Sequence, residues 1–511
     1  MSERTLQISP EGWTLDELKA LREDASIRVT LSETSRAAVE ASRGIVESHL
    51  GDGNAYYGIN TGFGKLSSQR IPAEKIELLQ RNLILSHACG VGDPLPVTTA
   101  RRMLLLRALS LARGYSGART AVVDQLLALY NRGITPVIPE QGSVGASGDL
   151  APLAHLAMVL IGEGEAIVDG KRMSGAEALE QAGLEPLVLQ AKEGLALING
   201  TQMMTSLGTG VALDLQHLSR VADIAGALSL EALMGSIKPF DGRIHQLKPH
   251  PGQVTVAENV RRLLEGSEIL PSHADCNRVQ DPYCLRCMPQ VHGASRGALD
   301  HVCQVLTTEI NSVSDNPLIF EDGDILSGGN FHGQAISMAM DYAGIAAAEW
   351  ASISERRIEN LVNPDLSGLP AFLVEGGGVN SGFMIPQVVA AALVSENKGL
   401  AHPASVDSIP TSGNKEDHVS MGVTAARTAR AITRNLERVL AIELMCGAQG
   451  LDYRRPLKAG RGVEAAFSQI RERVTKLECD RYLAPDIDAL VELVKDRRFV
   501  ERVEESAGKL S

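Results

Sequence analysis

Residues 142–157 read GSVGASGDLAPLAHLA, a glycine-rich loop that leads directly into an apolar helix. Glycine recurs at positions 142, 145 and 148, which lets the backbone adopt conformations that other residues disfavour. Two ordinary interpretations are a loop that caps the helix and a phosphate-binding turn at a helix N-terminus. The stretch lacks the G-K-[ST] of a P-loop, and its G-x-x-G-x-x-G spacing is not a dinucleotide-binding pattern. A different chemistry therefore has to be considered.

The tripeptide Ala146-Ser147-Gly148 can form an electrophile from the chain itself. In a tight turn the amide nitrogen of Gly148 attacks the carbonyl carbon of Ala146. Loss of water from the ring and from Ser147 then leaves a 4-methylideneimidazole-5-one group (MIO). The flanking glycines permit the compressed backbone that this cyclisation requires. No motif for a pyridoxal cofactor is evident, so a built-in electrophile is the cofactor that we expect.

Further motifs occur along nearly the whole chain, and several independent motifs are more specific than one glycine loop. They are YYGINTGFG (56–64), LILSHACGVG (83–92), NGTQ (199–202), QDPYCLRCMPQVHG (280–293), SDNPL (314–318), GGNFHG (328–333) and GNKEDH (413–418). Together with the loop at 142–157, this set closely resembles the MIO-dependent aromatic amino acid ammonia-lyases.

The resemblance implies roles for residues around the electrophile. Tyr57 matches the base that takes the β-proton of the substrate, and Tyr283 matches a second active-site hydroxyl. Asn199 matches an amide that supports the ring or the substrate carboxylate, and Phe331 matches an aromatic wall beside the ring. From the residues alone, Tyr57 and Phe331 could equally be packed loop residues.

The resemblance also assigns the carboxylate of an amino acid substrate to Arg286, with Gln280 as another substrate-binding residue. A guanidinium group binds a carboxylate through two parallel hydrogen bonds, which suits any amino acid. Gln280, Tyr283 and Arg286 recur every three residues and could therefore line one side of a short turn or helix. The alternative for Arg286 is a solvated surface side chain.

Two places in the sequence bear on the choice of substrate. Ser86-His87 matches the members that deaminate histidine, whereas phenylalanine-type relatives carry an apolar pair and tyrosine-preferring relatives tend to carry His-Leu. Glu416 stands where phenylalanine-type members carry glutamine, and its carboxylate would hold an imidazole and disfavour a phenyl ring. The resemblance thus implies deamination of L-histidine to trans-urocanate and ammonia. The alternatives are a tyrosine or phenylalanine ammonia-lyase and a related aminomutase.

Composition and charge restrict the class of protein. The 511 residues are 44% hydrophobic and 22% charged, as in an ordinary globular chain, and the net charge of −13 disfavours nucleic acid or anionic membranes as partners. No transmembrane run or secretory signal is evident, so we expect a cytoplasmic protein. Cys284 and Cys287 form a C-x-x-C without a second such pair, and we expect reduced cysteines and no metal site.

The distribution of apolar residues predicts a mainly α fold. Long segments rich in Ala, Leu, Ile or Met need neighbours to cover them, which favours a helical bundle; they are 201–235, 293–314, 333–361, 384–400 and 424–445. We expect a smaller mixed α/β domain at 1–200 that carries the MIO loop, and a helical core domain at 201–511. The resemblance implies a fumarase- and aspartase-like architecture and a homotetramer.

Two further classes of protein remain as alternatives to an MIO enzyme. A cofactor-free lyase of the fumarase and aspartase type would share the long helices, but its G-S-S-x-M-P loop is absent. A non-enzymatic helical assembly protein would use the glycine loops only to cap helices. Intact mass separates the second alternative, because cyclisation removes two water molecules.

Overall fold

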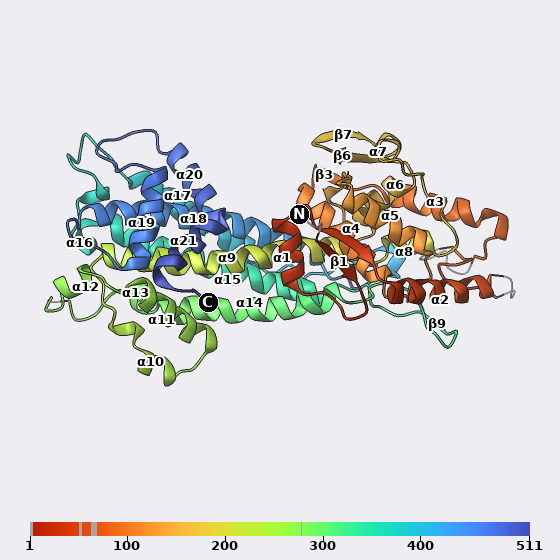
Figure 1. Ribbon diagram of the computed structural model, residues 1–511, viewed down its shortest axis with the longest axis horizontal. Helices are drawn as coiled ribbons and strands as arrows, with labels where there is room; N and C mark the ends of the chain where they lie inside the picture. Colours follow the sequence, from red (N-terminus) through yellow and green to blue (C-terminus); the bar gives the residue numbers. More distant parts are fainter. Residues whose placement is uncertain (1–3, 51–53, 63–68, 277) are drawn as a thin grey trace. The chain divides into compact units, whose positions relative to one another are not determined.

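The computed structural model describes residues 4–50, 54–62, 69–276 and 278–511 (Figure 1). The chain forms two compact units, each built from three segments. Unit 1 comprises Met1–Gly210, Cys303–Met340 and Pro403–Arg427, and unit 2 comprises Val211–Val302, Asp341–His402 and Thr428–Ser511. The expected domains had a single boundary at 200/201. The observed units are discontinuous, because boundaries fall inside the helices α9 (Gln202–Ala232), α14 (Met288–Ile310), α15 (Gln334–Val362) and α18 (Gly422–Asp452).

Unit 1 combines helices with small sheets. Its remaining helices are α1 (Leu15–Glu23), α2 (Glu33–His49), α3 (Ile76–His87), α4 (Val97–Leu111), α5 (Thr120–Asn131), α6 (Leu150–Leu160), α7 (Gly175–Gln181) and α8 (Glu193–Ile198). The helices α3, α6 and α8 pack against one another, as do α4 and α5 (Figure 1). This packing places the loop that precedes α6 next to the ends of α3 and α8.

Within the part of unit 1 that the structure describes, the named strands form four separate small sheets. β1 (Thr5–Ile8) pairs in parallel with β2 (Arg28–Leu31), and all the other pairings are antiparallel. These join β3 (Val91–Pro94) to β5 (Pro139–Gln141), β4 (Thr135–Pro136) to β6 (Glu165–Val168), β6 to β7 (Lys171–Ser174), and β8 (Leu318–Ile319) to β9 (Ile325–Leu326). The turn between β6 and β7 is Asp169-Gly170, and both residues have positive φ, at 48° and 78°. Such a turn matches the right-handed twist of a hairpin.

Among the described residues of unit 2, helices joined by loops make up the structure, and none of the named strands lies there. Unit 2 holds α10 (Gly242–Gln246), α11 (Pro251–Leu263), α12 (Ile269–Ser272), α13 (Tyr283–Arg286), α16 (Pro364–Ser367), α17 (Met384–Leu400), α19 (Arg461–Arg473), α20 (Ala484–Lys495) and α21 (Arg497–Ala507). α19 packs against α11, α20 and α21. In α18, which covers the apolar segment expected at 424–445, one face is buried, since Ile432, Leu436, Val439 and Leu440 are at most 1% exposed. The prediction of a mainly α fold with long helices is confirmed.

Hydropathy along the helices bears on membrane insertion. Among the described residues, no helix combines the length and apolar character needed to cross a lipid bilayer.

Candidate active site

A cavity of about 890 Å³ opens in unit 1 beside the glycine loop. Its volume lies within the range typical of small-molecule sites, about 300–1,000 Å³. The elements around it are the turn at 54–62, the helices α3 and α8, the loop at 142–149, and segments from the 303–340 and 403–427 parts of the unit. Six of the predicted site residues line it: Tyr57, His87, Ser147, Asn199, Phe331 and Glu416.

The loop that carries Ala146-Ser147-Gly148 is compressed. Ser147 has a positive φ of 50°, in the left-handed region where a residue with a side chain is strained. Gly148 has φ 77°, and a Cβ atom there would lie 2.2 Å from the carbonyl oxygen of Gly200. A Cβ atom at Gly145 would lie 2.1 Å from Oγ of Ser420. The observed conformation therefore requires glycine on both sides of Ala146-Ser147, and it suits the proposed cyclisation.

Asp149 anchors the end of this loop. Its backbone N–H donates to the carbonyl of Gly200 (2.7 Å), and its carboxylate accepts from the amides of Met203 (2.8 Å) and Met204 (3.0 Å) and from Oγ of Ser143 (3.0 Å). The side chain is fully buried, and burial raises the pKa of this carboxyl to about 7 although these hydrogen bonds oppose the shift. Asp149 thus joins the loop to the first turn of α9.

Asn199 follows the last residue of α8 and reaches the cavity. The side chain is 2% exposed, and its Nδ2 donates to the carbonyl of Asn316 (2.9 Å). Its Oδ1 is buried and has no hydrogen-bond partner among the described residues. A buried acceptor without a donor is costly, so Oδ1 offers a site for a donor on a bound molecule.

Arg107 of α4 forms hydrogen bonds to both ends of the connection between α8 and α9. This guanidinium is fully buried; it donates to the carbonyl of Ala196 and, through Nη1, to Oε1 of Gln202 (2.9 Å). Burial lowers the pKa of Arg107 to about 10, while the charge of Asp315 opposes the shift. A Cβ atom at Gly200 would lie 2.4 Å from Nη1 of Arg107, so the guanidinium packs directly against the backbone that borders Gly148.

Tyr57 lies in a turn that is held on both sides. Gly58 has φ 73°, and a Cβ atom there would lie 2.4 Å from Cδ2 of Leu195. Ile59 is fully buried in an apolar cluster, and Oδ1 of Asn60 accepts from the amide of Tyr56 (2.7 Å). The turn is thereby packed against α8, and Tyr57 lines the cavity.

His87 is the last residue of α3 and is half-buried in the cavity wall. Its Nδ1 lies 2.8 Å from the carbonyl oxygen of Leu83, which can only accept, so Nδ1 carries the proton. Burial lowers the pKa of His87, while the hydrogen bond to Leu83 and the charge of Glu416 oppose the shift. A neutral ring with its proton on Nδ1 leaves the lone pair of Nε2 as a hydrogen-bond acceptor.

Glu416 faces Ser147 across the cavity. Oγ of Ser147 donates to Oε1 of Glu416 at 2.7 Å, although the two residues are 269 positions apart. The other carboxylate oxygen accepts from Oγ1 of Thr411 (3.0 Å) and from the hydroxyl of Ser412. These contacts fix the carboxylate with Oε1 turned toward the glycine loop.

Phe331 follows the exposed glycines at 328 and 329 and is half-buried at the cavity. The backbone before it is held by a hydrogen bond from the amide of Gly328 to Oδ1 of Asn316 (2.7 Å). After it, the ring of His332 stacks on that of His418, with centroids 5.9 Å apart. Phe331 thus lies in an anchored loop.

Gln280, Tyr283 and Arg286 belong to unit 2 and are not among the residues that line the cavity of unit 1. The Tyr283 side chain is 70% exposed, and the guanidinium of Arg286 lies 4.5 Å from the centre of its ring. Nε of Arg286 is buried without a hydrogen-bond partner in the described residues. Gln280 is exposed and borders a separate hollow of about 410 Å³ together with Cys276.

The C-x-x-C pair lies in the same part of unit 2. Cys284 is buried, and burial raises the pKa of its thiol to about 11, which disfavours the thiolate that metal binding or redox chemistry requires. Within the described ranges, His, Cys, Asp and Glu side chains nowhere gather in groups of three or more that could hold a metal ion.

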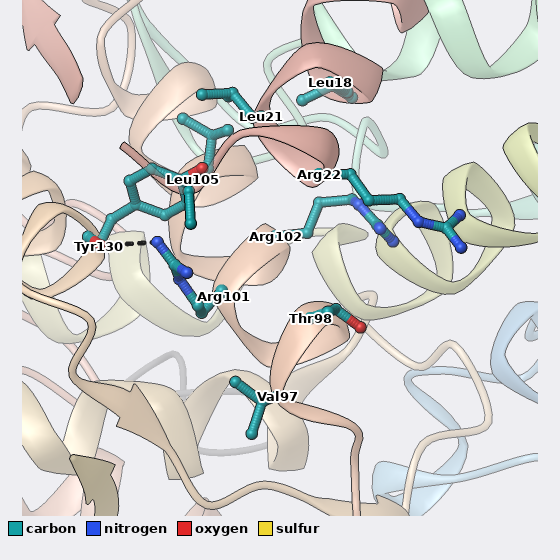
Figure 2. Close-up of a pocket in the computed structure, with 10 residues that line it drawn as sticks. Leu18, Leu21, Arg22, Val97, Thr98, Arg101, Arg102, Leu105 and Tyr130 are labelled. Carbon is teal, nitrogen blue, oxygen red and sulfur yellow. Dashed lines mark hydrogen bonds between the residues drawn. The ribbon is translucent and has the colours of Figure 1, made fainter. Parts of the chain in front are cut away.

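Figure 2 shows another cavity of unit 1, of about 190 Å³, between α1, α4 and α5. The guanidinium of Arg101 lies 4.9 Å from the ring centre of Tyr130 and donates to its carbonyl (3.3 Å), the dashed line in Figure 2. Arg102 donates to the carbonyl of Ser206 (2.6 Å). The lining consists of apolar side chains, threonine, tyrosine and arginine, without a carboxylate or histidine, so this cavity lacks an acid–base pair such as the first one has.

Some residues that shape the first cavity were not predicted from the sequence. Asp149 lies inside the quoted loop motif, yet only its buried position reveals it as an anchor. Arg107 stands within the apolar run MLLLRALSL, and a charge inside such a run was an available signal. Thr411 and Ser412 precede a quoted motif, and nothing local in the sequence points to their contacts with Glu416.

Comparison with known proteins agrees with these motifs. The model of the aromatic amino acid lyase family matches residues 13–472. A histidine ammonia-lyase of Symbiobacterium thermophilum is 56% identical over 498 residues, which are 97% of this chain and 98% of that protein. The crystal structure of histidine ammonia-lyase from Trypanosoma cruzi matches with a TM-score of 0.91 and 43% identity, covering 98% of this chain and 95% of that one.

The same fold also occurs in an enzyme that is named for a different activity. Tyrosine aminomutase from Streptomyces globisporus matches with a TM-score of 0.94 and 37% identity, covering 99% of this chain and all of that one (100%). The fold alone therefore does not select the substrate. The family match and the identity to its members do establish kinship, and the chain belongs to the aromatic amino acid lyase family.

Proposed function

We propose that the protein is a carbon–nitrogen lyase that removes ammonia from L-histidine without oxidation and releases trans-urocanate. The observation that carries this proposal is the presence of His87 and Glu416 in one cavity with Ser147, in a chain 56% identical to a protein named histidine ammonia-lyase. Both residues can bind a polar ring, and neither suits a phenyl ring.

The tripeptide Ala146-Ser147-Gly148 is our proposed source of the cofactor. The positive φ angles of Ser147 and Gly148 and the lack of space for a Cβ atom at Gly148 fit a cyclised loop. Ring closure joins the nitrogen of Gly148 to the carbonyl carbon of Ala146, and two waters leave in all. When formed, the MIO group supplies an electrophile that turns the amino group of the substrate into a better leaving group.

The side chains around the loop have separate tasks in this proposal. Tyr57 takes the β-proton, which is weakly acidic and needs a positioned base. Oδ1 of Asn199, buried without a partner among the described residues, accepts a hydrogen bond from the ammonium group of the substrate. Phe331 covers the cavity beside the ring and excludes water. Deamination thus depends on groups brought together by four different segments of unit 1.

The imidazole of the substrate is the part that distinguishes it from phenylalanine. Nε2 of the neutral His87 accepts one imidazole N–H, because its Nδ1 is committed to Leu83. The carboxylate of Glu416 binds the other nitrogen in its protonated form. A phenyl ring would leave both protein groups unpaired, at about 1–3 kcal/mol for each.

We further propose a homotetramer in which Gln280, Tyr283 and Arg286 of one copy complete the cavity of another. The Arg286 guanidinium would bind the substrate carboxylate, with Tyr283 and Gln280 beside it. Assembly is supported by α17, which exposes apolar side chains on its surface; these are Met384, Ile385, Val388 and Val389. Exposed apolar patches of this kind mark interaction sites.

Mixed assembly tests the shared site. Ser147→Ala and Arg286→Gln subunits are each expected to be inactive alone. If sites combine residues from different copies, random co-assembly should restore about a quarter of the sites. If each chain formed its own site, no mixture would regain activity. Light scattering gives the number of copies.

The substrate is tested by following urocanate formation from L-histidine spectroscopically. The second candidate, suggested by the fold shared with tyrosine aminomutase, is a lyase or aminomutase acting on tyrosine or phenylalanine. Cinnamate-type products or β-amino acids from those substrates, with no urocanate from histidine, would favour it. A cytoplasmic location and the absence of nucleic-acid and membrane partners remain predictions.

A further inference from the structure

We infer that Glu416 has a second task, which precedes any encounter with substrate. It is the acid–base partner of the Ser147 hydroxyl in the dehydration that creates the electrophile. This inference rests on the proposed function, because it concerns how the proposed MIO group forms.

The geometry around Ser147 singles out one titratable group. Oγ of Ser147 donates to Oε1 of Glu416 at 2.7 Å, and no other titratable side chain among the described residues is hydrogen-bonded to this hydroxyl. Asp149 is close in sequence, but its carboxylate is bonded to Ser143 and to the amides of Met203 and Met204. Glu416 is therefore the group placed to exchange a proton with Oγ.

The rest of the Glu416 carboxylate is held still. Oε2 accepts from Oγ1 of Thr411 (3.0 Å) and from the Ser412 hydroxyl, while the amide of Thr411 donates to the carbonyl of Glu416 (2.9 Å). Two hydroxyl donors on Oε2 leave Oε1 as the oxygen that faces the loop. Such an orientation is what a positioned acid–base group needs.

The chemistry of the methylene requires a proton at this point. Forming the Cα=Cβ bond of Ser147 breaks its Cα–H bond, whose electron pair becomes the double bond, and its Cβ–Oγ bond, whose pair leaves with oxygen. Hydroxide is a poor leaving group. Oγ donates to the Glu416 carboxylate before the step, so Glu416 first takes up a proton from solvent and then passes it from Oε1 to Oγ as the Cβ–Oγ bond breaks. The α-proton passes to solvent, and one water departs. Glu416 is then left as a carboxylate.

This sequence of events links maturation to substrate binding. While Ser147 keeps its hydroxyl, Oε1 of Glu416 is occupied by it. Once the water has left, the same oxygen has lost its partner and can accept from the imidazole of the substrate. A loss of activity in a Glu416 variant therefore has two separable parts, one from incomplete maturation and one from weaker binding.

The test measures maturation without any substrate. Newly synthesised protein is sampled over time, and mass spectrometry of the peptide that contains residues 142–157 reports the fraction that has lost water. In Glu416→Gln we expect the Ser147 hydroxyl to leave about 100-fold more slowly, in line with the usual contribution of a general acid. Glu416→Asp keeps a carboxyl group and should mature faster than Glu416→Gln.

His87→Leu is the matched control, because His87 lines the same cavity but has no bond to Ser147. It should mature at the wild-type rate although its use of histidine is impaired. Wild-type maturation rates in both Glu416→Gln and Glu416→Ala would overturn the inference. So would equally slow maturation in the Asp and Gln variants, which indicates a structural effect. A wild-type protein that never loses water would instead refute the proposed MIO group itself.

Discussion

Replacing His87 with leucine tests how the cavity recognises the substrate ring. In the structure Nδ1 of His87 is committed to the Leu83 carbonyl at 2.8 Å, and burial lowers the pKa of the ring. The group offered to the cavity is therefore a neutral Nε2 acceptor. Leucine fills a similar volume at the end of α3 but has no hydrogen-bond acceptor. The change therefore removes one polar contact with little loss of packing.

The magnitude follows from that single contact. An imidazole N–H left without a partner costs about 1–3 kcal/mol, which corresponds to a roughly 5- to 150-fold fall in kcat/KM for histidine. The same change removes a penalty against apolar rings, so kcat/KM for phenylalanine should stay constant or rise. The ratio of the two values is the clearest measure of specificity.

His49 provides a matched control. At the end of α2 it repeats the local arrangement, because its Nδ1 lies 2.8 Å from the carbonyl of Ile45 and 3.2 Å from Oγ of Ser48. At the end of α3 the corresponding contacts of His87 are made with Leu83 and Ser86. His49 does not line the cavity, so His49→Leu removes the same helix-terminal hydrogen bond from outside the cavity wall. Its ring packs edge-on against Tyr56 with centroids 5.0 Å apart, and leucine keeps an apolar contact there.

The assay is the initial rate of urocanate formation over a range of histidine concentrations. Rates are divided by the fraction of subunits that have lost two waters, so that maturation does not enter the comparison. If kcat/KM for histidine in His87→Leu stays within about twofold of wild type, His87 does not bind the imidazole. An equal loss in His49→Leu would show that the effect comes from the helix ends and would refute the reasoning as well.

Three other predictions concern the buried groups around the loop. Gly148→Ala should prevent loss of water, read by intact mass, because its Cβ atom would lie 2.2 Å from the Gly200 oxygen at a φ of 77°. Lys192→Met should lower the free energy of unfolding, measured by urea titration, by about 3–5 kcal/mol. The reason is that Asp315, whose Oδ2 lies 2.7 Å from Nζ of Lys192, would remain fully buried without its cationic partner. A loss well below that range would mean that water reaches the pair. Burial raises the pKa of Asp149 from 3.8 to about 7, so between these values the folded protein holds a proton that the unfolded chain releases. Stability from this group falls as pH rises through that window, and Asp149→Asn should show a smaller decline than wild type between about pH 5 and about pH 7; identical slopes would contradict the shift.

Local structure followed from short-range signals. The helix at Leu15 begins with a capping box between Thr14 and Glu17, two residues only three positions apart. The hairpin turn at Asp169-Gly170 and the buried face of α18 likewise depend on residues only a few positions apart. The packing of segments that are far apart in the sequence leaves no such local signal. For this reason the sequence suggested a single domain boundary, whereas the chain passes between the two units several times.

The sequence by itself determined the family and the position of the long helices, and it singled out the tripeptide that we propose as the source of the electrophile. Motifs and periodicity are properties of neighbouring residues, which is why they can be recognised without the structure. Only the tertiary structure decided that Glu416 meets Ser147 across 269 positions, and that a buried Arg107 supports the backbone beside Gly148. It also placed Gln280, Tyr283 and Arg286 in the other unit from the cavity. Contacts between such distant residues depend on the free energy of the whole fold, including loop closure and the burial of charged groups. That free energy is a sum over many weak contacts, so a short stretch of sequence does not reveal it.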